Sequence, residues 1–144
     1  MDWDVPMLLS QTEAQLGQLF GQAESGPIPN GPAKGTAIIA PGTVYTHDIA
    51  EAVNLFVWQG KSFDGPHGVL RNRILAFGLN AIVAEVYKGP SLIDGRECIV
   101  IDYSKTSLIA KWVRDEIRLI GPDIYLGRCY WDNKPILYFA LQTD

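Results

Sequence analysis

Alternation of apolar and polar residues is the main pattern of the chain after residue 68. Segments rich in β-branched and aromatic residues recur there, separated by turn signals such as Gly78–Asn80. They begin at roughly the 8–12-residue interval that is typical of an antiparallel sandwich or barrel. We therefore predict strands over Val69–Phe77, Ala81–Tyr87, Glu97–Tyr103, Ile124–Trp131 and Pro135–Leu141, after a shorter strand over Thr36–Ala40.

The segment Trp112–Ile120 fits two periodicities. A helix would align Trp112 with Asp115, whereas a strand aligns Val113 with Ile117. A Gly-Pro pair follows the segment, and the next predicted strand needs an antiparallel neighbour. We therefore favour a strand here.

Helical periodicity marks two segments that precede the strands. The first is predicted to begin with a capping box at Ser10–Glu13 and to end at Gly26-Pro27, with an apolar stripe of Leu16, Leu19, Phe20 and Ala23. The second is predicted to begin with a capping box at Asp48–Glu51 and to end near Gly60. Between them, Gly26–Gly35 is too rich in Pro and Gly for a helix or a central strand, so we predict a connector.

The predicted fold is mainly β with two N-terminal helices (α+β), an antiparallel β-barrel of calycin-like or lipocalin-like architecture. Closing such a sheet into a barrel removes its exposed edges. The alternative is the cone-shaped α+β fold of small cyclases and hydratases, and both folds enclose an interior pocket. We expect one domain over residues 1–144, with residues 1–35 as helix and connector and residues 36–144 as a helix-capped barrel.

Composition and charge narrow the classes of function. The chain is 47% hydrophobic and 19% charged, which is typical of a globular protein. Its 12 Lys and Arg against 16 Asp and Glu argue against a nucleic-acid-binding protein, which usually has a basic face. No apolar run approaches the roughly 18–20 residues that cross a bilayer, and the acidic N-terminus lacks the features of a signal peptide. We therefore expect a cytoplasmic protein without membrane insertion.

Metal and cofactor signatures are missing from the sequence. His47 and His67 are not at zinc-ligand spacing from each other or from Cys98 and Cys129. Nucleotide-binding and serine-hydrolase motifs are also missing. We expect no metal and no cofactor.

Asp115 is the acidic residue that strand alternation places on an apolar face, together with Val113 and Ile117. A carboxylate among aliphatic side chains needs a hydrogen-bond donor or becomes protonated, and such a group suits general acid–base catalysis. The alternative is a structural carboxylate that caps a turn or pairs with an arginine. Arg118 would support Asp115 by stabilising negative charge, but alternation places it on the opposite face unless the strand is bulged or is a helix.

Polar-tipped side chains of the β region are candidates for ligand contacts. Arg71 and Arg73 share one face of the first long strand, which either lines the interior or faces solvent. Aromatic residues suit an apolar cavity with a few oriented hydrogen bonds, and they equally suit ordinary cross-strand packing. The candidates are Tyr103, Trp112, Tyr125, Trp131 and Tyr138.

The segment Val57–Phe63 resembles the W-x-G-K-x-F signature of the GXWXG family of small bacterial and fungal proteins. The resemblance continues, in order, through Tyr103-Ser104, Val113–Arg118, Gly127, Asp132 and Tyr138-Phe139, with Ser104 in place of an acid and Ile117 in place of an aromatic residue. It implies a small lipocalin-like barrel without an established activity. It also directs attention to Trp58, Lys61, Asp115 and Arg118, although Trp58 equally suits a structural anchor at the start of the barrel.

The leading prediction is a barrel that binds a small, mostly hydrophobic organic molecule. The first alternative is a cofactor-independent cyclase, isomerase or lyase that uses Asp115 with Arg118 or Arg73. The second is a protein-interaction domain whose barrel is filled by its own side chains. A homodimer is compatible with each of these functions.

Overall fold

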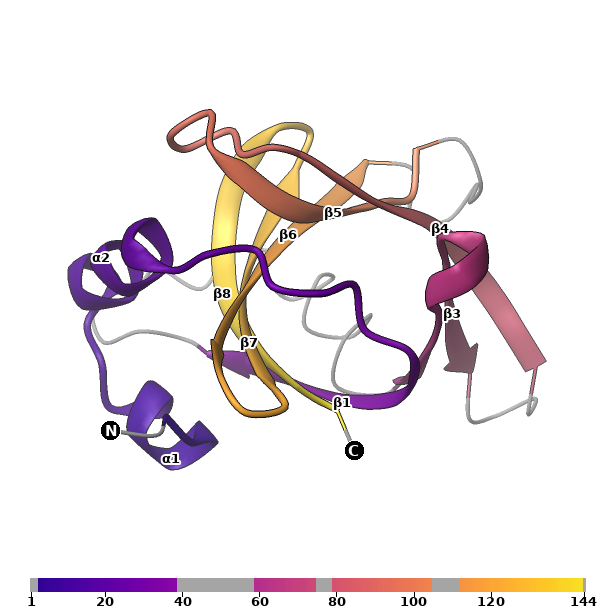
Figure 1. The fold of residues 1–144 in the computed structure, drawn as a ribbon, viewed down its shortest axis with the longest axis horizontal. Coiled ribbons are helices and arrows are strands. Elements are labelled where there is room, and N and C mark those ends of the chain that lie inside the picture. The colour runs from indigo at the N-terminus through magenta and orange to yellow at the C-terminus, as the bar shows by residue number, and fades with distance from the viewer. Residues whose placement is uncertain (1–2, 39–58, 75–78, 105–111, 144) are drawn as a thin grey trace.

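The computed structural model describes residues 3–38, 59–74, 79–104 and 112–143, and these residues form eight strands. Each strand pairs antiparallel with the next one in sequence, and the last strand pairs with the first, so the sheet closes into a barrel (Figure 1). The strands are β1 (Gly31–Ile38), β2 (Gln59–Asp64), β3 (Val69–Ile74), β4 (Leu79–Pro90), β5 (Glu97–Asp102), β6 (Val113–Gly121), β7 (Ile124–Trp131) and β8 (Lys134–Thr143).

The predicted β meander after residue 68 is confirmed, including the choice of a strand for the ambiguous segment that forms β6. The predicted turn at Gly78–Asn80 is wrong at its last two residues, because β4 already begins at Leu79, which pairs with Ile74. β2 begins at Gln59, so the predicted helix does not extend to Gly60. The rest of that helix, from Asp48, lies outside the described residues.

The predicted connector over Gly26–Gly35 is wrong in its second half, which belongs to β1. β1 pairs with β2 at its start and with β8 from Ala33 onward, so backbone pairing places these residues in the sheet. Pro32 pairs with β2 but not with β8. One side of the backbone is therefore unpaired at Pro32, as in an edge strand, where a residue without an N–H is tolerated. Barrel closure therefore overrides the local preference of Pro and Gly.

Two short helices precede the barrel, α1 (Val5–Leu9) and α2 (Glu13–Gln22). The capping box of α2 pairs Thr12 with Gln15: the Thr12 hydroxyl accepts the Gln15 N–H at 3.1 Å, and Gln15 Oε1 accepts the Thr12 N–H at 2.8 Å. The predicted box at Ser10 is wrong because Ser10 ends α1, a helix that the sequence pattern did not reveal. Among the described residues, no helix is long and apolar enough to span a membrane.

Buried apolar side chains form two clusters, one on each face of the sheet. The interior cluster includes Phe63, Ile99, Ile101, Tyr103, Val113, Ile117, Tyr125, Cys129 and Phe139. The outer cluster lies between the sheet and the two helices and includes Leu8, Leu16, Phe20, Ile38, Leu126 and Tyr138. Gly127 is required on the inner face, since a Cβ there would lie 2.2 Å from the ring of Phe139.

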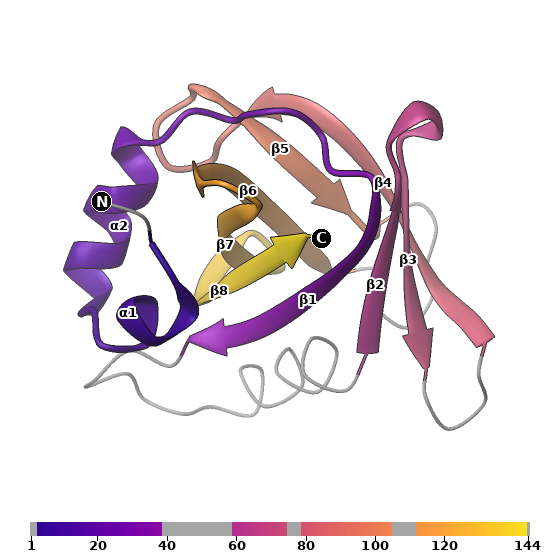
Figure 2. The ribbon, with the colours of Figure 1, turned by 60° about the horizontal axis from the view of Figure 1, so that its bottom comes forward.

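Residues 23–30, which we call the crossing segment, run from α2 along one end of the barrel to β1 (Figure 2). Its Ile28 packs against the interior cluster, and the carbonyl of Pro27 accepts the Tyr125 hydroxyl at 2.7 Å. The Leu119 N–H also donates to the Glu24 carbonyl at 3.0 Å. We call this the covered end of the barrel and the opposite one, where β6 begins at Val113, the far end.

Candidate functional site

β6 places ionisable side chains on both faces of the barrel wall. On the inner face, Asp115 is fully buried and shares its face with Val113 and Ile117. In the register of the sheet it lies opposite Ile101 on β5 and Cys129 on β7, both of which belong to the interior cluster. The predicted inward position of Asp115 is therefore confirmed, and the carboxylate has mainly apolar cross-strand neighbours.

Three of the predicted aromatic residues accompany Asp115 in the interior cluster or against it. Tyr103 and Tyr125 are buried members of the cluster, and Trp131 packs against it from a half-buried position. Burial raises the pKa of the Tyr125 phenol, whose hydroxyl is bonded to the crossing segment. Tyr103 follows β5 directly, so it lies toward the far end, as does Asp115.

A cavity of about 310 Å³ lies at the rim of the far end. Trp112 lines it and is 50% exposed, which is unusual for so large an apolar side chain. The Trp112 carbonyl accepts the Asp132 N–H at 2.9 Å, which ties the start of β6 to the turn between β7 and β8. The remaining lining residues are Asp102, Ser104, Val113, Arg114, Asp132 and Asn133.

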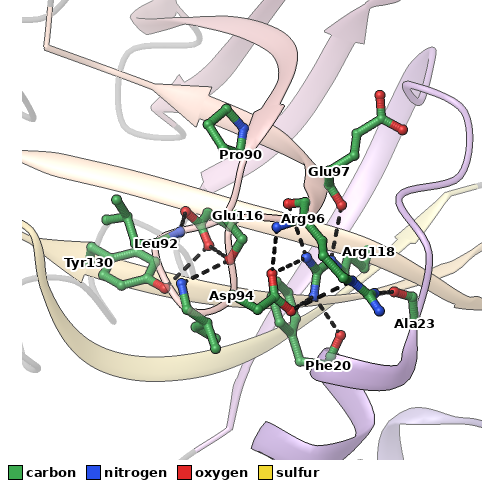
Figure 3. A network of polar contacts seen from close by, with 12 residues as sticks. Phe20, Ala23, Pro90, Leu92, Asp94, Arg96, Glu97, Glu116, Arg118 and Tyr130 are labelled. Carbon is green, nitrogen blue, oxygen red and sulfur yellow. Dashed lines mark hydrogen bonds and ion pairs between the residues drawn. The ribbon is translucent and has the colours of Figure 1, made fainter.

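Arg118, on the outer face of β6, is fully buried and uses all five of its guanidinium N–H groups (Figure 3). Two of them form a bidentate pair with the carboxylate of Asp94, at 2.8 and 2.9 Å. The other three donate to the carbonyls of Phe20, Arg96 and Glu97, at 2.9, 3.2 and 3.2 Å. The guanidinium also lies over the ring of Phe20, 4.6 Å from its centroid. Arg118 therefore joins α2, the β4–β5 loop and β5 to β6.

The ion pair has an electrostatic consequence for Asp94. The hydrogen bonds from Arg118 lower the pKa of the Asp94 carboxyl from 3.8 to about 2. Asp94 is therefore ionised throughout the physiological pH range, and its charge balances that of the buried guanidinium.

Glu116 is the second buried charge on the outer face (Figure 3). Its Oε1 accepts the hydroxyls of Ser91 at 2.7 Å and Tyr130 at 3.2 Å. Its Oε2 accepts the Leu92 N–H at 2.9 Å and forms an ion pair with Arg114 at 3.0 Å. Burial, together with the nearby carboxylate, raises the pKa of the Tyr130 phenol far above its ordinary value.

The predicted partnership of Asp115 and Arg118 is corrected by this geometry. The two side chains lie on opposite faces of β6, and Arg118 has no N–H left for a ligand. Tyr138 also lies outside the barrel, in the cluster beneath the helices, so the expectation that it lines the interior is wrong. Strand alternation left its face open, and packing against α2 decided it.

Three predicted ligand contacts stay predictions. Trp58 lies outside the described residues. The structure gives only the register of Lys61, which pairs with Ala33, and of Arg73, which pairs with Gly60. Glu116 and Asp94 are residues that sequence reasoning did not single out, and the alternation of Arg, Glu and Arg on β6 is the one signal that marked this face.

The described residues do not bring three His, Cys, Asp or Glu side chains together as a metal site. Burial raises the pKa of the Cys98 thiol to about 12, so this cysteine is a poor nucleophile at neutral pH. Among the residues whose side chains the structure describes, the inner face offers the carboxylate of Asp115 and the phenols of Tyr103 and Tyr125 for chemistry.

Neither a protein-family model nor a curated protein matches the chain. A protein from Thermomonospora curvata, known from its crystal structure, is similar in fold, with a TM-score of 0.64. The two chains are 16% identical, and the match covers 94% of this chain and 89% of the other. At this identity the likeness concerns the fold alone.

Proposed function

We propose that the protein is a lipocalin-like, calycin-type barrel that binds a small, mostly apolar organic molecule, with Asp115 contacting the one polar group of that molecule. The observation that carries the proposal is the fully buried carboxylate between Ile101 and Cys129 on the inner face. A buried carboxylate costs stability, and natural proteins keep such groups mainly at functional sites or in ion-pair networks.

The described residues cover one end of the barrel and line a cavity at the rim of the other. The crossing segment occupies the covered end, where Ile28 packs against the interior cluster and Pro27 is bonded to Tyr125. At the far end, the half-exposed Trp112 and the half-buried Trp131 supply apolar surface close to the rim cavity. Apolar rims with a few polar groups suit the capture of a small apolar molecule.

A cofactor-independent cyclase, isomerase or lyase is the second candidate. It is favoured by the same carboxylate, because a buried acid or base among apolar residues suits proton transfer to a bound organic substrate. In this version Asp115 moves the proton, and Tyr103 and Tyr125 are the phenols that belong to the same interior cluster. Arg118 has no part in it.

The test is binding of N-phenyl-1-naphthylamine, a neutral apolar fluorophore with a single N–H donor. We expect its emission to rise on binding to the wild-type protein and its affinity to fall about tenfold or more in Asp115→Asn, which loses a charged acceptor. Glu116→Gln is the matched control, since it neutralises a buried carboxylate of the same strand on the opposite face, and its affinity should equal that of the wild type.

Absence of binding to the wild type, together with native mass spectra that hold no small molecule, would instead support a filled barrel that serves protein interaction. Equal loss of affinity in both variants would show that the effect of Asp115 comes through the fold. A ligand found by mass spectrometry and returned chemically changed would favour the enzyme.

A further inference from the structure

Two arginines on the outer face of neighbouring strands are bonded in opposite ways. Arg118 on β6 uses every guanidinium N–H. The side-chain Nε of Arg128 on β7 is buried and has no hydrogen-bond acceptor in the part of the chain that the structure describes. A buried donor without an acceptor is destabilising, so its presence needs an explanation.

The Arg128 side chain is held by aromatic rings. Its guanidinium carbon lies 5.4 Å from the centroid of Tyr130 and 5.5 Å from that of Tyr138, distances at which cation–π attraction operates. Tyr130 is itself fixed by the hydrogen bond from its hydroxyl to Glu116. Tyr138 is the cross-strand partner of Arg128 in the register of β7 and β8. The rings orient the planar group while leaving its N–H edges for another partner.

Arg128 lines a small cavity between β8 and the start of α2. The cavity measures about 30 Å³. Its other walls are Glu13 and the mainly apolar residues Ile38, Pro135, Ile136, Leu137 and Tyr138. The apolar walls suit the organic part of a carboxylate, whereas inorganic phosphate has no apolar part to place against them.

We propose that Arg128 binds the carboxylate group of a small organic anion in this cavity. The planar guanidinium matches a carboxylate with two parallel hydrogen bonds, and Nε is one of the donors. The apolar body of the anion lies against Pro135 and Ile136, of which Pro135 is exposed and Ile136 half-buried. This site is on the outer face of the barrel and does not depend on the ligand proposed for the interior.

Glu13 sets the affinity of the site. Glu13 lines the same cavity, so its negative charge repels an incoming anion and competes with it for the guanidinium. The site therefore takes an anion weakly in the wild type and more strongly when the charge of Glu13 is removed.

The test is a titration of the ¹⁵N-labelled full chain with benzoate, followed by the NMR signal of each arginine Nε–H group. We expect the Nε–H signal of Arg128 to move in a saturable way. The corresponding signal of Arg118, whose Nε donates to the Glu97 carbonyl, should stay in place and serves as the internal control. An unmoved Arg128 signal overturns the proposal without the need for any variant.

Substitutions test the geometry. Glu13→Gln should strengthen benzoate binding, and Arg128→Gln should weaken it about tenfold or more. Arg128→Lys, which keeps the charge and loses the planar fork, should also weaken it. Inorganic phosphate should bind more weakly than benzoate. Equal binding in Arg128→Lys and wild type, tighter binding of phosphate, or weaker binding in Glu13→Gln would each overturn the proposed carboxylate site.

Discussion

The two faces of β6 bury charge in different surroundings. On the outer face, Glu116 and Arg118 lie among hydroxyls, backbone carbonyls and opposite charges, and each guanidinium N–H of Arg118 has an acceptor. On the inner face, the carboxylate of Asp115 lies between Ile101 and Cys129 in a cluster of mainly apolar side chains. Complete burial is common to all three residues, so burial alone does not identify a functional group. The hydrogen-bonded neighbours of the outer charges are polar or charged, whereas the cross-strand neighbours of Asp115 are Ile101 and Cys129.

The largest effect should come from the outer face. Arg118→Met should lower the free energy of unfolding by about 3–5 kcal/mol, since it removes one member of a buried ion pair and three further hydrogen bonds to backbone carbonyls. Urea denaturation measures this. Arg96→Met is the control, because the Arg96–Asp94 pair is longer, at 3.9 Å, and partly exposed, so its loss should cost less than about 1 kcal/mol. Equal losses of stability in the two variants would mean that Arg118 contributes no more to the network than Arg96 does.

The sharpest comparison of the two faces is between neighbouring carboxylates. Glu116→Gln should lower the free energy of unfolding by about 1–3 kcal/mol, because Ser91, Leu92, Tyr130 and Arg114 lose a charged acceptor. Asp115→Asn should cost less than about 1 kcal/mol if its carboxylate serves a ligand, since residues kept for function contribute little to stability. A loss in Asp115→Asn as large as in Glu116→Gln would assign the inner carboxylate a structural role.

Acid should weaken the outer network through Asp94. Its pKa falls from 3.8 to about 2 on folding, so its contribution to stability is complete above pH 4 and is lost as the pH decreases toward 2. After allowance for solvent screening, the contribution is on the order of 1 kcal/mol. Urea denaturation of wild type and Arg118→Met at pH 5 and at pH 2.5 measures it. The difference between the two proteins should shrink at the lower pH, and a constant difference would contradict the assignment.

The smallest predicted effect concerns the covered end. Tyr125→Phe removes the hydrogen bond to the Pro27 carbonyl and should lower the free energy of unfolding by about 0.5–1.5 kcal/mol. Amide hydrogen exchange should become faster in the crossing segment, for instance at Ile28, and stay unchanged at the far end. Unchanged exchange in the crossing segment would show that Ile28 packing alone holds it.

The alternation of residues along β6 correctly predicted which of its side chains face the interior of the barrel. Val113, Asp115 and Ile117 were placed inside from alternation alone, because the pleat of a strand directs every second side chain to the same face. Pattern was weaker where backbone pairing decides the structure, as in β1, or where an element is short, as in α1. The five residues of α1 are too few for a helical period to be recognised.

The sequence by itself determined the order of the strands after residue 68 and the inward position of Asp115, since both depend on residues that are close along the chain. Only the tertiary structure decided what surrounds the buried charges. The acceptors of Arg118 lie between 21 and 98 residues away along the chain, on α2, the β4–β5 loop and β5. Likewise, Tyr138 faces the helices because the outer cluster forms there, and no local spacing encodes that contact. Hydrogen bonds and packing between distant segments form only when the barrel closes. The structural role of Arg118 and the outward position of Tyr138 therefore became visible only in the tertiary structure.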